Sequence, residues 1–149
     1  MLKRIIYLII LLVIFSCEKN NNSPNIVFIL ADDLGYGDLS SYGSETIETI
    51  NIDKLAENGV KLTSYYAAQP VCSASRAAIL TGVYPNRIGI YNAFGPTSDS
   101  GISHNEYTLA EMLKDNGYKT AIFGKWHLGS KKEFFPTKHG FDEFYGILY

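Results

Sequence analysis

Residues 108–129, TLAEMLKDNGYKTAIFGKWHLG, carry a helix pattern, a turn signal and a strand pattern in one short run. Apolar residues recur at helical spacing over residues 108–116, and Gly117 follows as a stop signal, so we expect a helix that ends there. Residues 118–123 are typical of a strand. That strand would present the polar segment 124–129 at its carboxyl end.

The same alternation extends through the rest of the chain, and it predicts an α/β fold with a mainly parallel sheet. Residues 25–30 are a continuous apolar run of the kind found in strands covered on both faces. Residues 52–58 have helical spacing and precede a glycine, and residues 60–66 can return as a strand. A further helix is expected over residues 74–80, with Cys72 at its head.

Composition limits the class of protein. The 149 residues suffice for one domain with a hydrophobic core, and 46% apolar with 19% charged residues is typical of a globular chain. The net charge is −2 and the chain has no basic stripe, so the sequence predicts no nucleic-acid partner.

The first residues have the pattern of a processing signal. A charged start is followed by an apolar run over residues 5–15, which is short for a transmembrane helix, so we interpret residues 1–16 as a lipoprotein signal peptide. Residues 17–24 would form a polar tether with a lipid anchor at Cys17. We therefore expect an exported bacterial lipoprotein in the periplasm or cell envelope. The outer membrane is one of the membranes that could hold the lipid anchor. An ordinary secretory signal is the alternative.

Three groups of reactive side chains are expected to meet in one crevice. Asp32 and Asp33 follow the first predicted strand, and Lys125 and His127 follow residues 118–123. Open α/β sheets bind ligands outside the carboxyl ends of their strands. Cys72, at the head of its helix, would lie at the same edge.

The two adjacent aspartates are candidate metal ligands. Carboxylate oxygens suit calcium or magnesium rather than zinc, for which the sequence has no cysteine and histidine cluster. Adjacent strand residues point to opposite faces, so Asp32 and Asp33 can converge only in a turn, for which Gly35 and Gly37 provide freedom. An Asx turn or helix cap is the alternative. Asp38 is either a third ligand or a solvated turn residue.

The basic residues suggest an anion site. Lys125 and His127 are two apart, so in an extended segment they would project to the same side. The lysine can neutralise an anionic oxygen, and the imidazole can exchange a proton with a hydroxyl. Arg76 shares a helix face with Cys72, and its planar fork suits a tetrahedral oxyanion. The alternatives are a surface lysine, a packing histidine, a solvated arginine and, for Cys72, a small buried side chain.

The motifs in order resemble those of one enzyme family. Residues 72–76, CSASR, are similar to the maturation signal of sulfatases, in which the cysteine is oxidised to formylglycine. Residues 24–149 resemble sulfatases of the arylsulfatase type in the family's own order, through the stretches at 24–27, 32–38, 51–56, 59–60, 72–76, 80–82, 84–87, 108–110, 117–120, 124–129, 140–142 and 144–146.

The resemblance implies an alkaline-phosphatase-like fold, of which this chain is the N-terminal part with an incomplete sheet, and one calcium ion at the nucleophile, with magnesium as the less favoured ion. It also implies a formylglycine-generating maturase as a partner. Ala74 stands where many relatives have proline, which bears on which maturase reads the site. The implied metal ligands are Asp32, Asp33 and residue 72, and the implied catalytic residues are Cys72 as nucleophile, Arg76 beside its hydrate, Lys125 on the sulfate and His127 on the second hydroxyl.

The expected function is hydrolysis of sulfate esters, either of sulfated carbohydrates, small or polymeric, or of aryl sulfates. The alternatives are a phosphonate monoester or phosphodiester hydrolase of the same superfamily, and a non-catalytic carbohydrate-binding lipoprotein. Family members are several times longer and bring a second pair of metal ligands. The resemblance therefore implies that residues 25–149 are the first portion of a catalytic domain, inactive alone.

Overall fold

The computed structural model describes residues 23–149, and the predicted signal peptide and Cys17 lie outside the described residues. The chain divides into two compact units, one that ends at Asp33 and one that runs from Leu34 to Tyr149. Within residues 23–149 no helix has the length and apolar character needed to span a membrane.

The described part of the first unit, residues 23–33, is an extended segment without a helix or strand. The side chains of Ile26 to Leu30 are 43–83% exposed. The strand predicted at residues 25–30 is therefore wrong for the described chain. An apolar run becomes a strand only when a neighbouring strand takes up its N–H and C=O groups, and the run itself does not specify that partner.

The second unit opens with two short 3₁₀ turns, Tyr36–Asp38 and Ser40–Tyr42, and helix α2, Ile50–Asn58. The Asp53 carboxylate ties this part together, because it accepts hydrogen bonds from Ser40 Oγ at 2.5 Å and from Thr49 Oγ1 at 2.9 Å. The bond from Ser40, partly opposed by burial, lowers the pKa of Asp53. The helix predicted at residues 52–58 is confirmed. The strand predicted at residues 60–66 is wrong, because that segment is an exposed loop.

Helix α3, Cys72–Thr81, begins two residues before the predicted start and ends at Gly82, whose φ of 68° closes the helix with a bond from its N–H to the Ala78 carbonyl. Helix α4, Leu109–Asp115, is shorter than predicted and begins with a capping box formed by Thr108 and Glu111. A 3₁₀ turn, Pro85–Ile88, follows α3.

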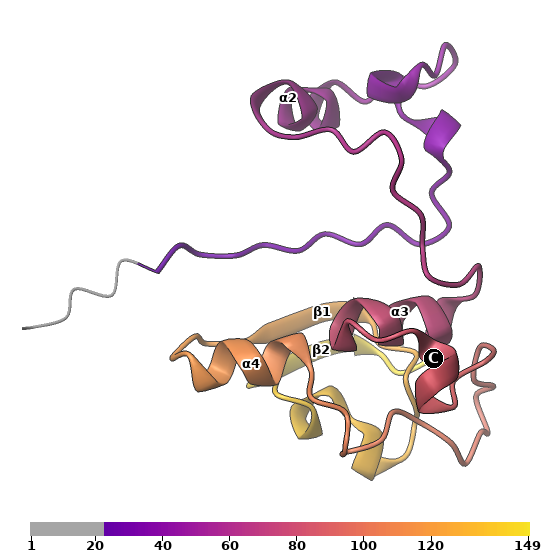
Figure 1. The fold of residues 1–149 in the computed structure, drawn as a ribbon, viewed down its shortest axis with the longest axis vertical. Coiled ribbons are helices and arrows are strands. Elements are labelled where there is room, and N and C mark those ends of the chain that lie inside the picture. Colours follow the sequence, from indigo (N-terminus) through magenta and orange to yellow (C-terminus); the bar gives the residue numbers. More distant parts are fainter. Residues whose placement is uncertain (1–22) are drawn as a thin grey trace, which may run out of the picture. The chain divides into compact units, whose positions relative to one another are not determined.

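Strands β1, Ala121–Lys125, and β2, Glu143–Ile147, form a parallel two-stranded sheet, and they run side by side in Figure 1. Ala121 pairs with Glu143 and Lys125 with Ile147. The crossover between the strands contains two 3₁₀ turns, Lys132–Phe134 and Pro136–Lys138. The backbone continues the pairing for one residue, because Trp126 N–H donates to the Ile147 carbonyl at 2.8 Å.

The core joins α3 to the end of β1. Its buried members are small side chains on α3, two isoleucines from the following loops, and two residues just after β1: Ala74, Ala77, Ile90, Ile102, Trp126 and Leu128. Burying these side chains fixes the helix against the strand end. The core therefore holds in place the start of α3, where Cys72 lies, and the segment after β1, where His127 lies.

Candidate active site

Cys72 is the first residue of α3 and carries a half-buried thiol. Val71 before it is extended, and the first helical hydrogen bond runs from Ser75 N–H to the Val71 carbonyl. The N–H groups of the first turn have no partner within the helix, and the helix start favours negative charge. The position therefore suits a residue that becomes anionic or binds an anion.

Lys125, the last residue of β1, brings a cation to this thiol. Its Nζ lies 3.7 Å from Cys72 Sγ, and the Lys125 side chain is half-buried. In that setting an ammonium group is screened less by solvent than a surface lysine would be. The predicted meeting of the helix start and the strand end is thus present in the structure for these two residues.

Arg76 supplies a second link between the same two elements. Its Nη1 donates a 2.6 Å hydrogen bond to the Lys125 carbonyl oxygen. The bond joins the second turn of α3 to the terminal residue of β1. Because the carbonyl belongs to Lys125 itself, Arg76 fixes the backbone from which the lysine side chain reaches Cys72.

His127 is buried and has a left-handed backbone, with φ of 57°. Its Nε2 lies 2.8 Å from the Phe94 carbonyl oxygen, and its ring forms a T-shaped contact with the Tyr149 ring, with 5.1 Å between centroids. The expectation that Lys125 and His127 lie in one extended segment is wrong. The strand ends at Lys125, and a residue with positive φ breaks the alternation of side chains.

Asp32 and Asp33 belong to the other unit and are exposed. Both lie in a bend, and Asp33 itself has φ of 57°. The change of backbone direction expected at this pair is therefore at Asp33 itself, and the glycines at 35 and 37 do not adopt positive φ. Aspartate tolerates this conformation better than most residues. Asp38 accepts a 2.8 Å bond from Gly35 N–H, which is the role of a turn residue.

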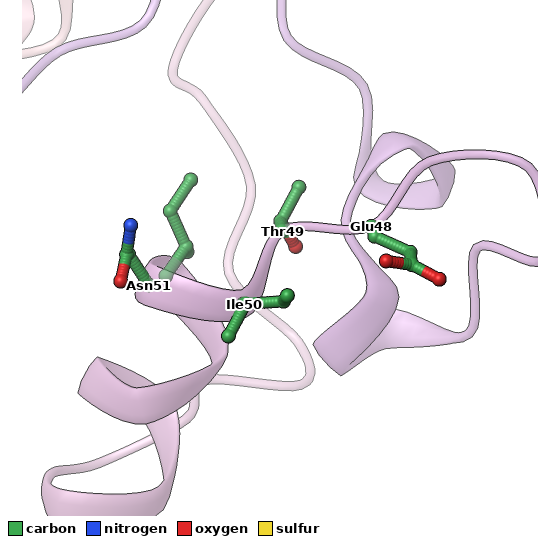
Figure 2. A pocket seen from close by; sticks show the side chains of 5 residues that line it. Glu48, Thr49, Ile50 and Asn51 are labelled. Carbon is green, nitrogen blue, oxygen red and sulfur yellow. The ribbon is translucent and has the colours of Figure 1, made fainter.

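A buried histidine and a surface hollow are further candidate sites, and neither includes a predicted site residue. His139 is fully buried, stacks on His104 at 4.9 Å between centroids, and has a pKa lowered by burial and then by that neighbour, which fits a packing role. Figure 2 shows an open hollow at the start of α2, with none of the predicted catalytic or metal-binding residues among its lining, which consists of Glu48, Thr49, Ile50, Asn51 and Ile52.

Sequence reasoning missed two residues that contact the site. The Phe94 carbonyl bonds His127, and the fully buried Ser73 hydroxyl accepts a 2.9 Å bond from Phe94 N–H. A main-chain carbonyl in a loop has no residue-type signature, so Phe94 could not be found from the sequence. Ser73 could have drawn attention only as the neighbour of Cys72.

The matches to known proteins follow the same stretch of chain. Residues 24–149 match the sulfatase family. The chain belongs to the sulfatase family. This sulfatase chain is 48% identical to human steryl-sulfatase over 92% of its length, and 49% identical to rat N-acetylgalactosamine-6-sulfatase over 83%. It spans about a quarter of each relative, 26% and 25% respectively.

Solved structures agree with this assignment. The chain superposes on Ps i-CgsB with a TM-score of 0.80 at 44% identity, covering 84% of this chain and 28% of that one. It superposes on the PsFucS1 sulfatase from Pseudoalteromonas sp. with a TM-score of 0.71 at 42% identity, covering 79% and 24%. The predicted family and the predicted α/β fold, matched to the N-terminal part of sulfatases, are confirmed.

Proposed function

We propose that the protein containing this chain hydrolyses sulfate esters, with residue 72 as a formylglycine nucleophile. The observation that carries the proposal is the approach of Lys125 Nζ to Cys72 Sγ, 3.7 Å, at the start of α3. A nucleophile, a cation and the N–H groups of a helix start are the groups that attack on a tetrahedral anion requires. Family membership supports the same chemistry.

A formylglycine at residue 72 can both attack the sulfate ester and later release the sulfate, because its hydrate carries two hydroxyls. A maturase supplies the oxidant that converts the Cys72 side chain to an aldehyde, and water adds to give two hydroxyls on one carbon. One hydroxyl oxygen attacks sulfur, the ester oxygen leaves with a proton as the alcohol, and a sulfated residue 72 remains. The second hydroxyl then loses its proton, its electrons form the C=O bond, and sulfate leaves. A serine lacks that second hydroxyl, so its sulfated form would persist.

The basic residues have separable tasks in this scheme. Lys125 holds the sulfate oxygens, since its ammonium lies beside the side chain of residue 72, whose oxidised and hydrated form carries the attacking hydroxyl. Arg76 holds Lys125 in place through the hydrogen bond to its backbone carbonyl. Arg76 also lies on the same face of α3 as residue 72, where it can stabilise the formylglycine hydrate. His127 takes up the proton of the second hydroxyl, because a neutral imidazole carries one free lone pair.

Asp32 and Asp33 fit a calcium ion by donor chemistry and by backbone shape. Both are acceptor-only carboxylates, both are exposed, and the positive φ of Asp33 interrupts the extended segment that would otherwise point them apart. We propose that they bind calcium together with residue 72, with magnesium as the less favoured ion. When bound, calcium would lower the charge repulsion between the sulfate group and the nucleophile.

We also propose a sulfated carbohydrate as the substrate class, with aryl sulfates as synthetic equivalents. The support is that Ps i-CgsB has been solved in complex with k-i-k-neocarrahexaose and that a relative is named for N-acetylgalactosamine 6-sulfate. The location as a lipoprotein anchored at Cys17, in the periplasm or cell envelope, remains part of the proposal and rests on the sequence alone.

A comparison of two substrates tests the reaction class. The full-length protein, co-expressed with a maturase, should hydrolyse 4-nitrophenyl sulfate, and Cys72→Ala should not. Greater kcat/KM on phenyl phosphonate would favour the phosphorus hydrolase instead. Binding of sulfated oligosaccharide without turnover of either ester would favour a non-catalytic protein.

A further inference from the structure

Two consecutive hydrogen bonds link the residue after the nucleophile to the site histidine. Phe94 N–H donates to Ser73 Oγ at 2.9 Å, and the Phe94 carbonyl oxygen lies 2.8 Å from His127 Nε2. Ser73 is 0% exposed and His127 is 6% exposed. Both bonds are partly buried, because Phe94 itself is half-buried, so each has a buried side chain at one end and solvent competes less for it than for a surface bond.

The second bond determines which nitrogen of His127 carries the proton. A carbonyl oxygen only accepts hydrogen bonds, so Nε2 must be the protonated, donating nitrogen. In the neutral ring the lone pair is then on Nδ1. That atom is buried, and among residues 23–149 it has no hydrogen-bond partner. Nδ1 is thus the one ring atom able to accept a proton from another group.

The Phe94 carbonyl needs an outside support to stay in this position. Phe94 lies in a loop without helix or strand, directly before Gly95. In such a segment the backbone direction depends on tertiary bonds rather than on a ladder of regular ones. The buried Ser73 hydroxyl provides such a bond from the first turn of α3, which is a rigid element.

We propose that Ser73 is a positioning residue that, through the backbone of Phe94, keeps His127 in the Nε2–H tautomer and so reserves Nδ1 as the proton acceptor of the site. The proposal rests on the proposed function. The start of α3 would then position both reacting groups. Residue 72 is the nucleophile, and Ser73, next to it, supports the base His127 through Phe94. It also explains how the strained φ of His127, 57°, is maintained.

Nitrogen-15 NMR of the full-length protein, labelled in histidine, tests the tautomer directly. The spectra are recorded at a pH high enough for the neutral ring, in which the two nitrogen shifts report which nitrogen is protonated. His127→Gln assigns the resonances. Wild-type His127 should be the Nε2–H form, and Ser73→Ala should give a mixture of the two forms. A wild-type Nδ1–H form, or an unchanged tautomer in Ser73→Ala, would overturn the proposal.

Two further variants make this result specific. Ser103→Ala removes the same kind of bond, from Asn105 N–H at 3.2 Å, and should leave the His127 shifts unchanged. If Ser73→Ala does not fold, Ser73→Cys replaces it, because a thiol sulfur accepts only weakly, and the same shift to a mixture is expected. An unchanged tautomer in that variant would overturn the proposal in the same way.

Kinetics separates this inference from the proposed function. With rates divided by the formylglycine content of each preparation, Ser73→Ala should lower kcat on 4-nitrophenyl sulfate by about tenfold or more, with little change in KM, because acid–base catalysis contributes about 10²–10⁴-fold. An unchanged kcat would refute the positioning role. If the wild type hydrolysed no sulfate ester, the proposed function would fail while the tautomer result still stood.

Discussion

The ammonium of Lys125 lies 3.7 Å from the sulfur of Cys72, across a separation of 53 residues. The contact joins the carboxyl end of β1 to the first residue of α3, which are the two kinds of position where α/β proteins gather ligand-binding groups. Arg76 ties the same two elements with a 2.6 Å bond to the Lys125 carbonyl. The pair is therefore held by backbone anchorage as well as by its own contact.

Removal of the Lys125 charge should weaken both binding and turnover. Lys125→Ala should raise KM and lower kcat on 4-nitrophenyl sulfate, with a loss in kcat/KM of about 10²-fold, because the ammonium holds the sulfate oxygens in the ground state and holds them more strongly in the transition state. Lys131→Ala is the matched control, since Lys131 pairs with the exposed Asp99 at 2.8 Å. An effect confined to KM would contradict the stronger hold in the transition state, because it would mean that the lysine binds the ground and transition states equally.

Metal and proton roles should respond differently to added calcium. Asp33→Asn should lose activity that excess calcium partly restores, because a weakened ligand shifts a binding equilibrium that mass action can offset. His127→Ala should lose about 10²-fold or more in kcat without rescue, since it removes a proton-handling group. Activity is measured against calcium concentration for each variant.

Asp38→Asn serves as the control for Asp33, because the Asp38 carboxylate accepts from Gly35 N–H in a local turn. Its calcium dependence should match that of the wild type. If calcium rescued the Asp33 and His127 variants equally, the separate assignment of metal and proton roles would have to be given up.

Asp142 should make the fold sensitive to strong acid. A 2.7 Å bond to Lys114 and, next, one from Thr120 N–H lower the pKa of Asp142 from 3.8 to about 2. Because the folded pKa is the lower one, the stabilising effect is complete above about pH 4 and is lost as the pH falls through about 2. Urea unfolding midpoints between these values should fall less in Asp142→Asn than in the wild type.

Asp115→Asn is the control for this pH experiment, because the Asp115 carboxylate accepts from the exposed Tyr107 hydroxyl. Its midpoints should follow the wild-type pH dependence. Parallel curves for the wild type and Asp142→Asn would show that the carboxylate does not link α4 to the start of the strands.

The lipid anchor can be tested by fractionation of the host cells. Cys17→Ala should move the protein from the membrane fraction to the soluble fraction, because a lipidated Cys17 is the proposed membrane anchor. Cys72→Ala is the matched control, since it removes a cysteine that carries no lipid in this scheme. An unchanged distribution of the Cys17 variant would contradict the lipoprotein interpretation.

Local signals predicted the elements that carry their own start and stop residues. The glycines at 59 and 117, used as stop signals, fixed the positions of α2 and α4 to within about two residues, as such signals usually do. The strands at residues 25–30 and 60–66 were wrong because strand formation depends on a partner elsewhere in the chain.

The site was predictable where position in an element determines it. Cys72 at a helix start and Lys125 at a strand end follow from patterns in the sequence, and the structure brings the two together. The bond from His127 to the Phe94 carbonyl and the positive φ of His127 depend on loop geometry, which no residue type encodes. The roles assigned to these side chains remain predictions.

The most direct test of the central claim is the chemical state of residue 72. Trypsin cleaves after Lys61 and Arg76, so peptide 62–76 isolates this residue for mass spectrometry. In an active preparation of the full-length protein, the account predicts the aldehyde or its hydrate at residue 72. A wholly unmodified Cys72 thiol in a preparation that hydrolyses sulfate esters would contradict it.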